Sequence, residues 1–141
     1  MRYLLDTHIF VWHAKEQDSL SPEVSAIIGD YENELLLSME SVKELLVAYR
    51  TKPLFRRYWK TPISMIDYIQ RQYGIRIVQP DMEVMRTLAK LEINEAEAHN
   101  DPSDHIIISQ AITMKLPLIS SDRKFPFYVK QGLDLIYNKK Q

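Results

Sequence analysis

Four acidic residues stand where carboxylates from distant parts of the chain could act together. Asp6 directly follows a short apolar run, and Asp122 follows a second apolar run after two serines. Glu44 and Asp104 lie in segments with helical patterns. Hard divalent cations such as Mg²⁺ and Mn²⁺ prefer oxygen ligands, and they can activate water for the hydrolysis of phosphodiesters. These four residues are therefore candidate ligands of a catalytic metal site.

The acidic residues also have purely structural explanations. Asp6 could cap the segment that follows it, and Asp101, which precedes a proline, is a favourable helix N-cap. Asp104 would then lie in the first turn of the same helix, where the helix dipole stabilises a carboxylate. Because Asp104 shares a helical stripe with Ile108 and Ala111, we expect it to face inward.

The elements that must position these residues alternate between strands and helices. We expect strands at 3–5, 35–37, 75–78 and 118–120 and a weaker one at 133–137, with helices from 21, at 38–49, 61–74, 81–91 and 101–114. This alternation predicts an α/β fold, a three-layer α/β/α sandwich with a mostly parallel sheet, in a single domain over residues 1–141. In such sheets the ligand site lies beyond the carboxyl ends of the strands, where Asp6 and Asp122 are expected.

Composition excludes several classes of protein. Among 141 residues, 18 Lys and Arg oppose 19 Asp and Glu, so the formal net charge of −1 disfavours binding of nucleic acid through bulk positive charge. The absence of cysteine excludes disulfides, thiolate zinc sites and iron–sulfur clusters, and it fits a cytoplasmic location. With only 3 glycines there is no glycine-rich phosphate loop, and no apolar run approaches the roughly 20 residues of a membrane span.

Four ordered motifs connect the chain to a known family. They are Leu5–Trp12 (Leu-Asp-Thr-His-Ile-Phe-Val-Trp), Ser38–Glu44 with Ser-x-x-Glu at its end, His99–Asp104 (His-Asn-Asp-Pro-Ser-Asp), and Leu116–Asp122 with Ser-Ser-Asp after a strand. In this order and with this spacing the chain resembles PIN-domain ribonucleases, in particular the VapC-type toxins of type II toxin–antitoxin pairs. The resemblance extends over nearly the whole sequence.

The resemblance implies an acidic catalytic and metal-binding site at four positions, Asp6, Glu44, Asp104 and Asp122, with Mg²⁺ or Mn²⁺ as cofactor. It also implies supporting roles for Asp101, Ser120 and Thr7, where Asp101 is either an outer ligand or only a helix cap. Ser103 and His105 depart from the family pattern, which usually has Phe and Arg at these positions. His99 matches a position of the third motif, but a single histidine is as often a capping or packing group as a catalyst, so it is not included among the site residues.

A basic and aromatic segment lies at residues 49–60. Arg50, Arg56, Arg57 and Trp59 could contact an RNA substrate through phosphates and stacked bases, or they could line a groove for an antitoxin. A helical hairpin with packed aromatic residues and solvated charges would explain the same segment.

The expected function is hydrolysis of RNA phosphodiesters by a metal-dependent endoribonuclease, the toxin of a toxin–antitoxin pair. The resemblance implies a cognate antitoxin and a homodimer, and no membrane association is expected. Two alternatives stay open: a degenerate PIN-like module that only binds a partner, and a phosphoacceptor receiver-type domain. The receiver alternative is disfavoured because Asp122 occupies the strand end where such domains require a lysine.

Overall fold

A computed structural model describes residues 1–72 and 74–139, and five parallel strands form its central sheet. The strands are β1 (Arg2–Leu5), β2 (Glu34–Ser38), β3 (Arg76–Val78), β4 (Leu118–Ser120) and β5 (Leu135–Tyr137). Their order in the sheet is β3-β2-β1-β4-β5, and each neighbouring pair is parallel. The sheet of the described residues is therefore wholly parallel, where the sequence predicted a mostly parallel one.

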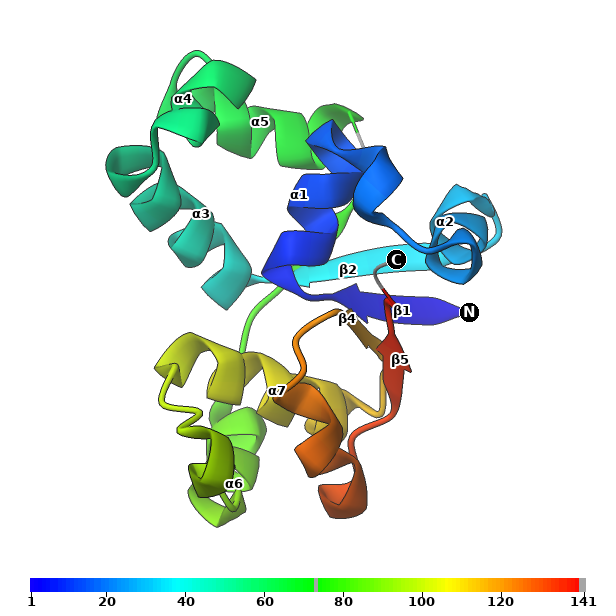
Figure 1. Cartoon of the computed structure of the whole chain (residues 1–141), viewed down its shortest axis with the longest axis vertical. Coiled ribbons are helices and arrows are strands. Elements are labelled where there is room, and N and C mark those ends of the chain that lie inside the picture. The colour runs from blue at the N-terminus through cyan, green and yellow to red at the C-terminus, as the bar shows by residue number, and fades with distance from the viewer. Residues whose placement is uncertain (73, 140–141) are drawn as a thin grey trace.

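Helices connect the strands on both sides of the sheet (Figure 1). They are α1 (Thr7–Lys15), α2 (Pro22–Gly29), α3 (Met39–Thr51), α4 (Pro53–Tyr58), α5 (Pro62–Gln72), α6 (Met82–Lys90) and α7 (Pro102–Met114), with 3₁₀ turns at Gln17–Ser19, Glu95–Glu97 and Phe125–Gln131. None of the helices in the described part of the chain combines the length and apolar composition that crossing a membrane requires. The predicted helix 61–74 includes residue 73, which lies outside the described residues.

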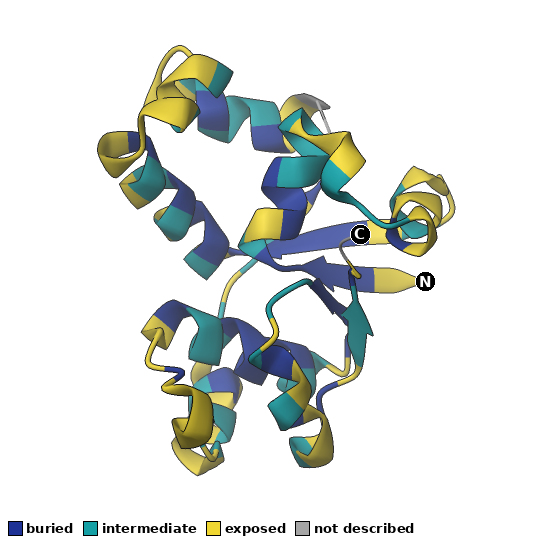
Figure 2. Ribbon diagram, viewed as in Figure 1, coloured by how far each residue is buried: buried dark blue, intermediate teal, exposed yellow. Residues whose placement is uncertain are grey.

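Two hydrophobic clusters, one on each face of the sheet, explain the layered arrangement. Because side chains alternate along a strand, Leu5 and Leu37 pack into one cluster with α1, α2, α3 and α5. Leu4 and Leu36 point the other way and pack against α7 and the Phe125–Gln131 turn. In Figure 2 the inner parts of β1 and β2 are dark because both faces of these strands are covered, whereas the edge strand β5 is only partly buried. The predicted three-layer sandwich is confirmed.

The sequence did not predict α1 as a helix, and it offered a helix in the segment of α4 only through the helical-hairpin alternative for residues 49–60. Helix α1 starts at Asp6, whose side chain accepts the Thr7 backbone N–H, and it buries Ile9, Phe10 and Val11. β-Branched residues have only modest helix propensity, so this helix depends on the burial of one face against the sheet. The contacts that decide its conformation are therefore tertiary.

The two central strands place their ends side by side. Leu5 is paired with Ile119, and the backbone N–H of Asp6 donates to the Ile119 carbonyl at 2.9 Å. From β1 the chain crosses to β2 on one side, while β4 lies on the other side. This is the switch point at which open parallel sheets bind ligands, and both Asp6 and Ser120 lie there.

Candidate metal centre

The carboxylate of Asp6 is fixed at the end of the central strand β1. Asp6 is only 5% exposed, and its Oδ1 accepts the Thr7 backbone N–H at 2.8 Å. Its Oδ2 accepts the hydroxyl of Ser120 at 2.7 Å, and Ser120 is itself fully buried at the end of β4. Burial raises the pKa of Asp6, although the Ser120 hydrogen bond acts in the opposite direction. Because both oxygens accept a hydrogen bond, the orientation of this carboxylate is determined by its neighbours.

Helix α3 brings Glu44 to the same edge of the sheet. The Thr7 hydroxyl donates to Glu44 Oε1 at 2.7 Å, and it also lies 2.8 Å from the Ser41 hydroxyl. Burial raises the pKa of Glu44, and the nearby charge of Asp101 raises it further. Thr7 thus connects the start of α1 to the acidic face of α3.

Asp101 and Asp104 enter the site from the N-terminus of α7. Asp101 Oδ1 accepts the backbone N–H groups of Ser103 at 3.0 Å and of Asp104 at 3.3 Å, so its predicted capping role is confirmed. The Asp104 side chain is 15% exposed. Ile108 and Ala111, on the same stripe, are buried, as the helical pattern predicted.

Asp104 is the carboxyl group most strongly affected by its surroundings. Burial raises its pKa to about 9, and the charges of Asp6, Asp101, Glu44 and Asp122 raise it too. Without a cation, this carboxyl therefore keeps a proton at neutral pH. A bound divalent ion would reverse the effect, because it is the largest charge in such a site and favours the ionised carboxylate.

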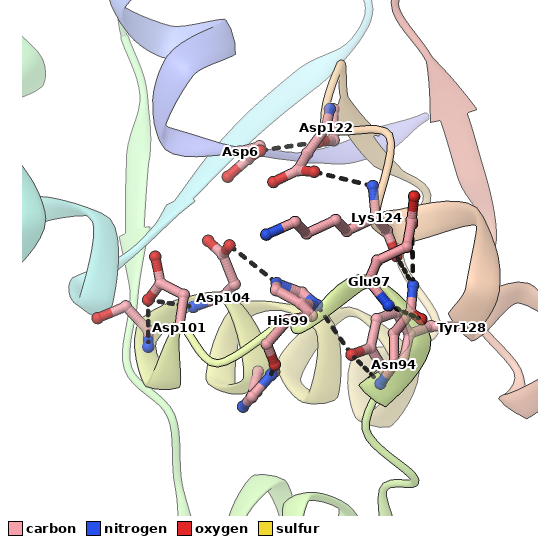
Figure 3. Close-up of polar contacts among 12 residues, drawn as sticks. Asp6, Asn94, Glu97, His99, Asp101, Asp104, Asp122, Lys124 and Tyr128 are labelled. Carbon is pink, nitrogen blue, oxygen red and sulfur yellow. Dashed lines mark hydrogen bonds and ion pairs between the residues drawn. The ribbon is translucent and has the colours of Figure 1, made fainter.

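Asp122 lies in the loop that follows β4. Its backbone N–H donates to the Ser120 hydroxyl at 3.1 Å, and its Oδ1 accepts the Lys124 backbone N–H at 2.8 Å. The Ser120 hydroxyl therefore links Asp6 and Asp122. Figure 3 shows the Lys124 side chain extending from this loop into the space between the labelled carboxylates. Lys124 is the only cationic side chain among the labelled residues of that view.

His99 is part of the site, although sequence analysis did not include it among the site residues. Its side chain is 1% exposed, with Nε2 3.0 Å from Asp104 Oδ2 and Nδ1 2.8 Å from the Tyr128 hydroxyl (Figure 3). Burial lowers the pKa of His99, and the neighbouring His105 lowers it further, which favours the neutral imidazole. The sequence signal was its place in the third motif, but its contact with Tyr128 depends on tertiary packing.

Two overlapping groups of side chains could hold a metal ion. In each group the ligand atoms lie within 4.8 Å of one another: Glu44, Asp101 and Asp104 form one group, and His99, Asp104 and Asp122 form the other. Carboxylate-rich donor sets of this kind suit Mg²⁺ or Mn²⁺. Asp104 belongs to both groups, whereas Asp6 belongs to neither and contributes its charge from the adjacent strand end.

A sixth nearby acid, Glu40, was not singled out from the sequence. Its Oε1 accepts Lys43 Nζ at 2.7 Å and the Ser103 hydroxyl at 3.2 Å, which links the start of α3 to that of α7. Ser103, one of the departures from the family pattern, thus makes a defined contact here. A groove of about 460 Å³ opens beside this link, lined by Lys43, Glu44, Val47, Ala48, Thr51, Lys52, Pro102 and Ser103.

Of the predicted contact residues of the basic segment, the three arginines Arg50, Arg56 and Arg57 are exposed, whereas Trp59 is buried. Arg56 Nη1 donates to the carbonyls of Tyr49 at 3.0 Å and Arg50 at 3.3 Å, so it caps the end of α3. Trp59 is 5% exposed and packs in the core, which corrects the prediction that it contacts a partner. The physical reason is that its ring is enclosed by neighbouring aromatic side chains. Arg50 and Arg57 are exposed.

Comparison with known families identifies one match. The model of the family described as PIN domain matches residues 3–130. A comparison with curated proteins found no match.

Solved structures with the same fold cover nearly the whole chain. VapBC2 from Rickettsia felis, bound to a DNA fragment from its promoter, has a TM-score of 0.71 at 18% identity, covering 99% of this chain and 100% of that one. VapBC-1 from nontypeable Haemophilus influenzae has a TM-score of 0.70 at 16% identity, covering 97% and 98%. VapBC-5 from Mycobacterium tuberculosis, a member of the VapBC family of toxin–antitoxin systems, has a TM-score of 0.63 at 17% identity, covering 98% of each chain.

Proposed function

Because this chain belongs to the PIN domain family, we propose that it is a metal-dependent endoribonuclease and the toxin of a type II toxin–antitoxin pair. One observation carries the proposal: four carboxylates from separate parts of the sequence converge at the carboxyl edge of the sheet. They are Asp6, Glu44, Asp104 and Asp122. A metal-dependent hydrolase of phosphodiesters uses a cluster of this kind to hold its divalent cation.

The electrostatics of the cluster supports a cation as its natural partner. Crowded carboxylates repel one another, and the pKa of about 9 at Asp104 measures the combined effect of burial and that repulsion. Buried carboxylates are ordinarily paired with a cationic side chain or bind a metal ion. Here the neighbours that raise the pKa of Asp104 are themselves acids, which is the arrangement expected of a metal site.

The side chains around the cluster have distinct proposed roles. A bound Mg²⁺ or Mn²⁺ would supply a water of lowered pKa and neutralise charge on the phosphate. Asp104, Asp122 and Glu44 would provide oxygen ligands, and Asp101 would assist from the helix cap. Ser120 would keep Asp6 oriented through its 2.7 Å hydrogen bond.

We also propose an antitoxin partner, in line with the VapBC complexes that share this fold. An acidic cluster without metal attracts a cation, and an arginine of the partner would bind carboxylates with two parallel hydrogen bonds. The groove next to Glu44 offers a path for such a segment, and the exposed Arg50 and Arg57 are candidate contacts with the antitoxin or the RNA. We propose further that the chain forms a homodimer and acts in the cytoplasm.

Assays of RNA cleavage test the proposed nuclease activity. The purified chain should cut RNA in Mg²⁺ or Mn²⁺ and should lose this activity in EDTA. Asp6→Asn and Asp104→Asn should abolish cleavage while the chain stays folded. Asp134→Asn is the matched control, because Asp134 is exposed and its carbonyl accepts the N–H of Leu118, at the end of β4 away from the site. Undiminished cleavage in EDTA or in Asp6→Asn contradicts the proposal.

Coexpression of the chain with neighbouring genes tests whether it has an antitoxin partner. Expression of the chain alone should arrest growth, and a small neighbouring gene product should copurify with the chain and restore growth. The RNA ends that appear after brief expression of the chain alone would identify the cleavage sites. An active chain that is harmless in its host and binds no such product would count against the toxin role.

A further inference from the structure

A buried chain of hydrogen bonds approaches Asp104 from behind the proposed metal centre. The Asn94 backbone N–H lies 3.1 Å from the Tyr128 hydroxyl, which lies 2.8 Å from His99 Nδ1, and His99 Nε2 lies 3.0 Å from Asp104 Oδ2. Tyr128 is 0% exposed, His99 1% and Asn94 3%. The set of proposed metal ligands does not explain the role of this series of hydrogen bonds.

Counting hydrogens assigns the tautomer of His99. The Tyr128 oxygen accepts from Asn94, and the Tyr128 hydroxyl has one hydrogen to donate. Among the described residues, His99 Nδ1 is the acceptor within reach of it. A hydrogen on Nδ1 would leave the buried Tyr128 hydroxyl hydrogen without an acceptor, at a cost comparable to a lost hydrogen bond. His99 therefore carries its hydrogen on Nε2, where it donates to Asp104.

The surroundings hold the imidazole in this orientation. Phe125 contacts the ring with centroids 5.7 Å apart, and His105 Nε2 donates to the His99 carbonyl at 2.8 Å. The Asn94 carbonyl accepts the His99 backbone N–H at 3.0 Å. Both the ring and its backbone are thus fixed by contacts outside the acidic cluster.

From this geometry we propose that His99 is a positioning residue: its Nε2–H, with the tautomer set by Tyr128, holds Asp104 Oδ2 and leaves the second oxygen of Asp104 for the metal ion. The inference rests on the proposed function, because it assumes that Asp104 is a metal ligand. It also implies that His99 is not a ligand itself. Its Nε2 atom, which faces Asp104, carries a hydrogen and has no free lone pair for a metal ion. Hydrogen bonds of this kind orient metal ligands and tune their affinity.

Binding of Mn²⁺, measured by titration calorimetry on the full chain, tests the inference without relying on cleavage. His99→Gln places an amide N–H near the position of Nε2, whereas His99→Asn places it near Nδ1, too far from Asp104. We expect His99→Asn to weaken Mn²⁺ binding about 10- to 100-fold and His99→Gln to recover most of the loss. Asp134→Asn is the control for substitution as such, because Asp134 is exposed and its carbonyl accepts the N–H of Leu118, away from the site.

The outcomes separate the inference from the proposed function. If Asp104→Asn abolishes Mn²⁺ binding but His99→Asn binds like the parent, only the positioning role is overturned. If His99→Gln binds as weakly as His99→Asn, a hydrogen-bond donor is not sufficient, and the inference is again overturned. A parent chain that binds no Mn²⁺ overturns both.

Two further measurements apply if His99→Asn does not fold. Tyr128→Phe removes the hydroxyl that sets the tautomer, and it should weaken Mn²⁺ binding in the same direction but less than the loss of the His99 donor. Imidazole ¹⁵N spectra of the metal-free parent distinguish the two neutral tautomers directly. We expect the Nε2–H form, and an Nδ1–H form in the parent would refute the assignment.

Discussion

Replacing Asp104 with asparagine should make the metal-free chain more stable and remove its response to metal. Asparagine has the shape of a protonated carboxyl, and its side-chain oxygen can accept the His99 Nε2–H as Asp104 Oδ2 does. The substitution therefore removes the charge of Asp104 with little change in packing. Burial and four acidic neighbours raise the pKa of Asp104 to about 9, so the parent must take up a proton at this site when it folds at neutral pH.

The size of the effect follows from that pKa. In the unfolded chain the carboxyl titrates near its ordinary value of about 3.9, and each unit of difference corresponds to about 1.4 kcal/mol. At pH 7 the proton uptake would thus cost at most about 4 kcal/mol. Because an effective dielectric of about 20 describes protein sites better than the low value of a dry interior, even where a group is buried, we expect a gain in the free energy of unfolding of only about 0.5–2 kcal/mol.

The sign of the pH dependence is fixed by the direction of the shift. The folded parent binds a proton that the unfolded chain releases, so the contribution of Asp104 to stability is most favourable below about pH 4 and decreases as the pH rises toward 9. The asparagine variant lacks this contribution. Its advantage over the parent should therefore be absent in acid and should increase with pH.

Urea denaturation in EDTA over this pH range, followed by melting curves with Mn²⁺, measures both effects. The parent should gain about 2.7 kcal/mol at a Mn²⁺ concentration 100 times its dissociation constant, and Asp104→Asn should lose most of that gain. Asp134→Asn, on the exposed surface, controls for the substitution itself. A variant that is destabilised in EDTA and keeps the full Mn²⁺ response would show that Asp104 is structural, and the proposed site would be wrong.

Three other sets of substitutions test separate parts of the structure. Asp101→Asn should change the free energy of unfolding by less than about 0.5 kcal/mol in urea titrations, whereas Asp101→Ala should cost about 1 kcal/mol, because only alanine removes the helix cap. Ser120→Ala should cost about 1–3 kcal/mol, since it leaves the buried Oδ2 of Asp6 without its hydroxyl donor; equal stability would refute the link. Trp59→Ala should cost about 3–5 kcal/mol while Arg57→Ala stays within about 0.5 kcal/mol, and a silent Trp59→Ala would contradict the burial of that ring.

The sequence alone determined the features that depend on local patterns. The apolar runs of β1, β2 and β4 are recognisable because strands buried on both faces are almost wholly apolar. The cap at Asp101 depends on the preference of a helix N-terminus for a short acidic side chain followed by proline. Parallel strands end at one edge, so the positions of Asp6 and Asp122 in the sequence were enough to predict that they lie near each other.

Tertiary structure alone decided which side chains face the site. Apolar residues lie on most sides of the Glu44 helix, so its orientation toward Thr7 emerged only when α3 packed against α1. The burial of Trp59 depends likewise on rings brought together by folding. His99 is the clearest case: it precedes Asp104 by 5 positions, but the tyrosine that sets its tautomer lies 29 residues away. Hydrogen bonds between distant segments produce no periodic pattern of residue types in a single sequence, because they are determined by the packing of whole elements.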